Sequence, residues 1–227
     1  MPDRPRSSGI IERTHVGLDR LRRSGMAGLL ALLAFGIFVM PVVFPSGADT
    51  TARATRILLL LILICGIAAI SEHRRLALSL AVLGAGIVAA YAAERVMPAL
   101  NVATFHDALL LAALLLLAIA VAISVFASRR TVGDRLFGAI GLYLLIGAIW
   151  ATLYAAIANT TPNAFAGQLA TGATMFDWGY FSLVTLTTVG YGDITPVAHL
   201  ARSLAALEAL IGQLYPAIII ARLVSAK

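Results

Sequence analysis

Long apolar runs dominate this chain and restrict what it can fold into. Of its 227 residues, 60% are hydrophobic and 12% are charged, and the mean hydropathy is +0.94, far outside the range of soluble globular proteins. Lipid offers the backbone no hydrogen-bond partners, so each run is expected to be a helix. Six runs are long enough, or nearly so, to cross a bilayer: 25–45, 55–71, 76–93, 107–128, 136–158 and 200–224. The sequence therefore predicts an all-α membrane protein with six transmembrane helices.

The basic residues indicate how these helices are oriented. With the N-terminus inside, 13 of the 17 basic residues fall on the cytoplasmic side and the other four, Arg53, Arg56, Arg95 and Arg202, fall outside. Cytoplasmic loops carry the excess of arginine and lysine in such proteins. We expect a multi-pass protein of the cell membrane with both termini cytoplasmic. The net charge of +6 is explained by this orientation, and no nucleic-acid partner is predicted.

The first two runs leave questions open. Arginines precede residues 24–48, so the first run could be a cleaved signal peptide, although its uncharged length exceeds an ordinary signal core. The second run has only residues 57–71 free of charge, so Arg56 is expected to extend toward the interface.

The most specific motif lies between the fifth and sixth runs, where residues 185–193 have the sequence TLTTVGYGD. This sequence is typical of a potassium selectivity filter, in which oxygen atoms replace the water shell of the ion. The expected oxygens are the carbonyls of Thr188, Val189, Gly190 and Tyr191, with the Thr188 hydroxyl. K⁺ is the permeant ion in this interpretation, and no organic cofactor is predicted.

Two glycines make such a filter possible. Successive carbonyls can face one axis only if the backbone alternates between ordinary and left-handed conformations, which Gly190 and Gly192 adopt at little steric cost. One chain supplies one edge of each oxygen ring, so the motif implies a homotetramer around a central pore. The alternatives are an accidental glycine turn or a fragment of a nucleotide-binding loop. A nucleotide loop would need a preceding strand and a following helix, whereas apolar segments flank this one.

The residues around the motif predict its supports. A polar turn at 159–163 is followed by an extracellular segment to Thr174, and a short re-entrant pore helix is expected over 177–187. Asp177 suits the start of that helix, and its C-terminal end would direct partial negative charge at the ion path. After the filter, 188–193, Pro196 prevents a helix and the chain returns outward.

From about residue 131 to the end, the chain resembles the two-helix pore module of tetrameric potassium channels. The resemblance covers an outer helix (136–158), the pore helix, the filter and an inner helix (200–224). It implies that Tyr180 and Phe181 form the family's aromatic pair and that Tyr180 braces the filter through Asp193. Val184 and Thr187 complete the filter support, and Val184 replaces a glutamate that some bacterial members carry.

On the inner helix the resemblance matches Arg202 to a basic residue at its start and Gly212 to the hinge glycine. At about 100° per residue, Gln213, Ile220 and Val224 share one face, with Pro216 nearby, and this face is expected to line the cavity and the gate. The alternative is that this face packs on the outer helix and a different one lines the pore.

Glu208 is the only ionisable residue deep within the six runs. It points about 140° away from Gln213, toward pore-helix hydroxyls such as Ser182 and Thr185. A carboxyl group in hydrocarbon needs a partner, a proton or water. We therefore expect either a neutral acid that fastens the inner helix or a modulatory, pH-sensing group.

The remaining segments are a basic N-terminal segment, 1–24, and a four-helix domain, 25–130. Four helices before a pore module resemble voltage-gated channels, but the fourth run contains no arginine ladder. Voltage gating through these helices is therefore expected to be weak. Arginines at the cytoplasmic boundary could contact anionic lipid headgroups, and His106 with Asp107 could sense external pH.

The function predicted from these features is passive, potassium-selective conduction, with no catalytic residues. Two alternatives remain open. A potassium uptake subunit would resemble four linked modules with degraded filters, and a polytopic membrane sensor with a vestigial pore would need ionisable residues inside the first four runs. The stimulus that opens the channel, and whether the four helices pack on their own pore module or on a neighbour's, are left open.

Overall fold

The structure is a computed structural model that describes residues 25–43, 49–70, 73–96, 103–126, 132–167 and 173–225. The predicted basic segment 1–24 lies outside these residues. The described part is mostly helical, as expected from the apolar runs. Its long helices are α3 (Asp49–Ala69), α4 (Arg74–Val96), α5 (Ala103–Phe126), α6 (Val132–Thr160) and α8 (His199–Ser225), with the short α7 (Met175–Leu186) before α8.

Five helices in the described part are long and apolar enough to cross a membrane. They are Gly25–Val43, Arg74–Glu94, Phe105–Phe126, Gly133–Thr160 and His199–Arg222. The second predicted run lies in α3, which begins at Asp49, well before the expected residue 55, and carries Arg53 and Arg56 in its first turns. A described helix therefore overlaps each of the six predicted runs, and five of these helices have the length and composition of a membrane span.

The first helix changes its winding near its end. Residues 25–34 are α-helical, η1 (Phe35–Val39) is a π-helical turn, and α2 (Met40–Val43) resumes the α-helix. Pro41 lacks an N–H group and its ring would press on a carbonyl one turn earlier, so a wider turn before it relieves the clash. Gly36 lies in this turn, where a Cβ would come within 2.5 Å of the Leu58 side chain on α3.

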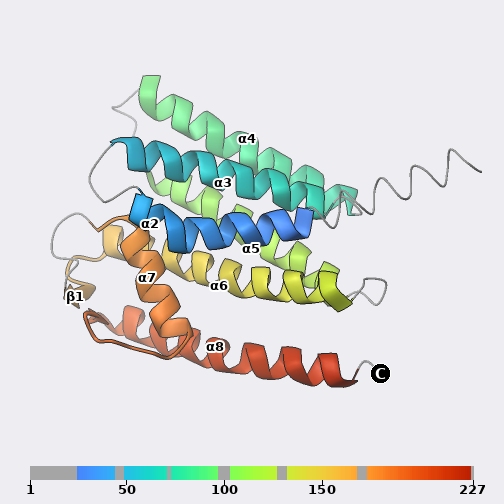
Figure 1. Cartoon of the computed structure of the whole chain (residues 1–227). Coiled ribbons are helices and arrows are strands. Elements are labelled where there is room, and N and C mark those ends of the chain that lie inside the picture. The colour runs from blue at the N-terminus through green and yellow to red at the C-terminus, as the bar shows by residue number, and fades with distance from the viewer. Residues whose placement is uncertain are drawn as a thin grey trace, which may run out of the picture.

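The helices form a layered bundle (Figure 1). In that view α4, α3, the first helix, α6 and α8 follow one another from top to bottom, while α5 lies behind them. Helix α5 packs against both α4 and α6, and the short α7 fits between α6 and α8. The start of the first helix and the end of α8 lie at one end of the bundle, and β1 lies at the opposite end.

A small antiparallel sheet was not anticipated from the sequence. Strand β1 (Phe165–Gly167) pairs with β2 (Ile194–Pro196), and Ala166 lies opposite Thr195. The segment before the pore helix is therefore not purely a loop, and the chain that leaves the filter is fixed to it. The sequence gives little signal for this pairing because each strand has three residues and Pro196 cannot donate a ladder hydrogen bond.

Two buried clusters hold the bundle together. The larger one runs through the first helix and α3 to α6. The smaller one lies in the pore module and is rich in aromatic rings, which meet edge to face with centroids 4.8 to 5.7 Å apart. Its rings are Tyr154, Phe165, Trp178 and Phe181. This second cluster fixes the pore helix against the outer helix and the sheet.

Candidate ion pathway and its supports

The pore helix is held at its first turn by a reciprocal cap. The Asp177 carboxylate accepts hydrogen bonds from the Thr174 backbone N–H and the Thr174 hydroxyl, both at 2.7 Å. The Asp177 N–H in turn donates to the Thr174 carbonyl at 3.1 Å. This cap explains why α7 begins at Met175 and not at the expected residue 177, since Asp177 already belongs to its first turn.

The filter backbone follows directly from the end of α7. The N–H groups of Val189 and Gly190 both donate to the Val184 carbonyl, at 2.9 and 3.2 Å. Thr188, Gly190 and Gly192 have positive φ angles of 59°, 55° and 81°. Every second residue is thus left-handed, which is the alternation that a row of inward carbonyls requires. Thr188 is the non-glycine member of this series, which the sequence did not reveal.

The C-terminal end of the predicted filter segment is braced from α7. The Tyr180 hydroxyl donates to Asp193 Oδ2 at 2.8 Å, and the Tyr180 and Tyr191 rings lie 6.4 Å apart with nearly parallel planes. Asp193 Oδ1 also accepts from the Ile194 N–H at 3.1 Å. The single carboxylate therefore connects the pore helix, the filter and the first residue of β2.

We predict that Tyr180→Phe weakens the filter without changing which ion it prefers. The substitution removes the hydrogen bond from the Tyr180 hydroxyl to the Asp193 carboxylate and leaves the ring in place. Purified protein should lose its assembled form at a lower temperature, and recordings should show shorter conducting periods. Tyr91→Phe, which removes a tyrosine hydroxyl from α4, is the control for conduction and should leave the conducting periods unchanged. Equal stability and equal conducting periods in wild type and Tyr180→Phe would contradict the bracing role.

The inner helix meets the filter through Gln213. Its Nε2 donates to the Thr188 hydroxyl at 2.7 Å, at the inner end of the filter. Pro216 and Ile220 are exposed further along the same helix, whereas the Val224 side chain lies outside the described residues. Helix α8 remains continuous through Pro216. Gln213, Pro216 and Ile220, which are expected to line the pore cavity, are thus exposed on the surface of the single chain.

Gly212 lies where the backbones of α8 and α7 approach each other closely. A Cβ at this position would fall 1.8 Å from the Leu186 carbonyl oxygen and 2.7 Å from its carbon. The Leu186 carbonyl also accepts a hydrogen bond of 3.3 Å from the Tyr143 hydroxyl. The structure thus gives Gly212 a close-packing role in addition to the hinge role that the resemblance implies.

Glu208 points away from this path. It contacts Ser182 on α7, as expected, and the Tyr154 hydroxyl on α6, while Thr185 is not among its hydrogen-bond partners in the described part of the chain. Tyr154 was missed by sequence reasoning. A tyrosine in an apolar span needs a hydrogen-bond partner for its hydroxyl. The presence of Glu208 in another apolar run could therefore have indicated that the two residues pair.

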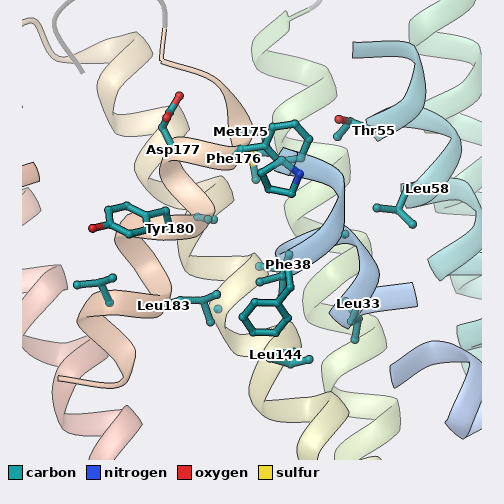
Figure 2. Close-up of a pocket in the computed structure, with 18 of the residues that line it drawn as sticks. Leu33, Phe38, Thr55, Leu58, Leu144, Met175, Phe176, Asp177, Tyr180 and Leu183 are labelled. Atoms are coloured by element: carbon teal, nitrogen blue, oxygen red, sulfur yellow. The ribbon is translucent and has the colours of Figure 1, made fainter. Parts of the chain in front are cut away.

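An apolar cavity of about 700 Å³ lies behind the pore helix and filter (Figure 2). One wall comes from the first helix and α3, where Figure 2 shows Leu33, Phe38 and Leu58. The other wall comes from α6 and α7, and the Val189 and Tyr191 side chains reach the same space. The four-helix domain and the back of the filter therefore share one cavity.

The four-helix domain has a polar cluster near the start of α5. Arg56 Nη2 lies 3.8 Å from Glu94 Oε2, and its guanidinium lies 4.4 Å above the Tyr91 ring. His106 packs against Tyr91 with ring centroids 4.2 Å apart, and its Nδ1 lies 3.4 Å from Asp107 Oδ1. The cluster joins α3, α4 and α5, and it lies away from the ion path.

Comparison with known proteins supports the interpretation of the C-terminal part of the chain as part of an ion channel. Residues 138–226 match the family model described as ion channel. The inward rectifier potassium channel Kirbac3.1 of Paramagnetospirillum magnetotacticum is 39% identical over 74 residues, which are 33% of this chain and 23% of that protein. Protein LctB of Geobacillus stearothermophilus is 35% identical over 92 residues, or 40% of this chain and 63% of that protein. LctB of Bacillus caldotenax is 49% identical over 45 residues, or 20% of this chain and 33% of that protein.

Each match covers less than two thirds of the relative, and no solved structure matches the chain significantly. The matched region contains most of α6, all of α7 and α8, and the filter between them. The family model and the similarity to Kirbac3.1 both support a channel and not an enzyme. Residues 138–226 thus match an ion channel domain, and part of the chain is similar to a potassium channel.

Proposed function

We propose that this chain is one subunit of a potassium-selective channel, in which four copies surround a central pore and conduct K⁺ passively across the cell membrane. The observation that carries the proposal is the left-handed φ at every second residue of the filter, Thr188, Gly190 and Gly192, in the sequence TVGYG. Carbonyl oxygens from such a segment replace the hydration shell of K⁺. The Thr188 hydroxyl, next to Gln213, would mark the inner entrance.

The tetramer is supported by surfaces that one subunit leaves open. In the single chain the Val189 and Tyr191 side chains are 53% and 71% exposed. Helix α8 exposes a row of large apolar residues, namely Leu200, Leu207, Leu210, Leu214 and Ile218. An inner helix that faces neighbours around a pore would cover such a row, and closed cyclic symmetry would complete each oxygen ring.

The proposed orientation places the filter outside and both chain ends inside. The filter and β1 lie at the end of the bundle opposite to the start of the first helix and the end of α8 (Figure 1). Near that second end, the Arg222 guanidinium lies 4.7 Å above the Phe126 ring, and Arg135 Nε is buried with no hydrogen-bond partner among the described residues. Arginines in this position suit contact with anionic lipid headgroups.

The direct test is potassium flux into liposomes that contain the purified protein. Flux driven by a K⁺ gradient should appear with the protein, and barium or a quaternary ammonium ion should block it. Liposomes with Na⁺ in place of K⁺ should show little flux. Equal K⁺ and Na⁺ fluxes would refute the proposed selectivity.

Gating through the four-helix domain should depend only weakly on voltage. Moving one elementary charge through the membrane field yields about 2.3 kcal/mol per 100 mV, so steep gating needs several charges in each subunit. Between Leu109 and Phe126, α5 contains no charged residue. We expect shallow conductance–voltage curves in planar bilayers. A slope equivalent to several elementary charges per channel, measured without blocking ions, would contradict this expectation.

A further inference from the structure

Glu208 is buried completely, with 0% of its surface exposed, between three helices of the pore module. The Tyr154 hydroxyl of α6 donates to its Oε2 at 2.6 Å. Its Oε1 lies 2.5 Å from the Ser182 hydroxyl oxygen of α7. Both carboxyl oxygens are therefore in short contacts, and the two contacts come from different helices.

Counting hydrogens links the protonation of Glu208 to the direction in which the Ser182 hydroxyl donates. Ser182 Oγ lies 2.8 Å from the Gly147 carbonyl oxygen as well as 2.5 Å from Glu208 Oε1. A carbonyl oxygen only accepts, and a serine hydroxyl has a single hydrogen to donate. If that hydrogen goes to Gly147, the contact between Ser182 and Glu208 needs a hydrogen from Glu208. In that arrangement a carboxylate would leave two oxygen atoms facing each other with no hydrogen between them, so a carboxylate requires Ser182 to donate to Glu208 instead of Gly147.

The described residues around Glu208 include no cation that would neutralise a carboxylate. Among the described residues, no arginine forms an ion pair with Glu208. From α6, Tyr154 and Tyr143 interact with Glu208. From α7, Ser182 faces it, and a serine hydroxyl does not titrate in the physiological range. A buried carboxylate without a cationic partner is strongly disfavoured relative to the neutral acid.

The position of the group connects it to the filter. Glu208 and Gly212 lie one turn apart on α8, and their partners Ser182 and Leu186 lie one turn apart on α7. The hydrogen-bonded contact and the glycine contact therefore form one continuous junction between the two helices. Beyond it, Gln213 reaches Thr188 at the inner end of the filter.

We propose that Glu208 is a protonated positioning residue, which donates to Ser182 while Ser182 donates to Gly147, and which thereby holds the inner helix and pore helix together behind the filter. When the proton leaves Glu208 Oε1 for a base in solution, Ser182 must donate to the carboxylate, and the Gly147 carbonyl loses the hydrogen bond from Ser182. Because the folded channel holds a proton here that an unfolded chain releases at neutral pH, the stability of the assembly falls as the pH rises.

Infrared difference spectra test the proton directly, and this readout does not depend on ion conduction. At neutral pH the spectrum of the full-length wild type in lipid should contain the C=O band of a buried protonated carboxylic acid. Glu208→Gln should lack that band, and Thr152→Ala should keep it. Thr152 is a matched control because, within the described part of the chain, its buried hydroxyl bonds only to Ala148 of its own helix, at 2.9 Å. A wild-type spectrum without a band that Glu208→Gln removes would overturn the proposal.

Variants separate positioning from simple packing. Glu208→Gln places an N–H donor toward Ser182 and a carbonyl toward Tyr154, so it mimics the neutral acid and should keep the assembled form at the wild-type melting temperature. Glu208→Leu and Ser182→Ala should both dissociate at lower temperature. The wild type should lose stability and K⁺ flux as the pH is raised, whereas Glu208→Gln should give a flat pH profile. A Gln variant as unstable as the Leu variant, or one with the wild-type pH profile, would contradict the assignment.

Discussion

Replacing Gly190 or Gly192 with alanine should abolish selective potassium conduction. Both residues have positive φ angles, 55° and 81°. A Cβ at either position meets no described atom of the single chain within 4 Å, so the effect should come from the backbone conformation and not from a steric clash within the subunit. The left-handed conformation costs a non-glycine residue about 1–2 kcal/mol, and the cost recurs in every subunit. The carbonyls should rotate out of line, and the measured K⁺ to Na⁺ flux ratio should fall toward unity or all flux should stop.

Gly141→Ala is the matched control for this pair. Gly141 also has open space where an alanine Cβ would lie, but it belongs to α6 and has no positive φ. Alanine is the better helix former, so the variant should assemble and conduct as the wild type does. Wild-type selectivity in Gly190→Ala and Gly192→Ala would show that the filter does not depend on left-handed glycines.

Gly212→Ala should prevent correct assembly of the pore. The added methyl group would lie 1.8 Å from the Leu186 carbonyl oxygen, and no side-chain rotation can relieve a clash with backbone. The inner helix must move away from the pore helix, which separates Glu208 from Ser182 one turn earlier. Overpacking of this kind typically costs about 1–3 kcal/mol at each site. Size-exclusion chromatography should show loss of the assembled form, and liposome flux should disappear.

Gly84→Ala provides the comparison for Gly212. Gly84 also lies within a helix, but the nearest atom to its Cβ would be Leu63 Cδ1 at 3.8 Å, an ordinary contact. That variant should assemble and conduct normally. An assembled, conducting Gly212→Ala channel would mean that α7 and α8 lie further apart than the structure shows. In that case the proposed junction behind the filter would also lose its support.

Much of this architecture was predictable because a membrane imposes strong rules on sequence. Apolar runs must be helices, and a described helix overlaps each of the six runs. The filter motif is short and specific, so the predicted filter could be located in the sequence without knowing the fold. Asp177 indicated the start of the pore helix to within two residues. The helix begins at Met175 because Thr174, and not Asp177, is the capping residue.

What could not be predicted depends on contacts between distant segments. The strands β1 and β2 pair through backbone groups, which leave little trace in three-residue segments. Tyr154 and Glu208 lie 54 residues apart, and only the packing of α6 on α8 brings them together. The closeness of Gly212 to Leu186 likewise follows from the angle at which two uniformly apolar helices meet. Such helices carry no strong periodic signal for their facing sides.

The central claim is that the TVGYG segment of this chain forms a potassium-selective pore. The most direct test is the reversal potential of the purified full-length protein in a planar bilayer with K⁺ on one side and an equal concentration of Na⁺ on the other. We predict a current that reverses far from zero, at a voltage that shows K⁺ to be strongly preferred, and a shift toward zero in Gly190→Ala wherever that variant still conducts. A wild-type current that reverses at zero under these conditions would contradict the account.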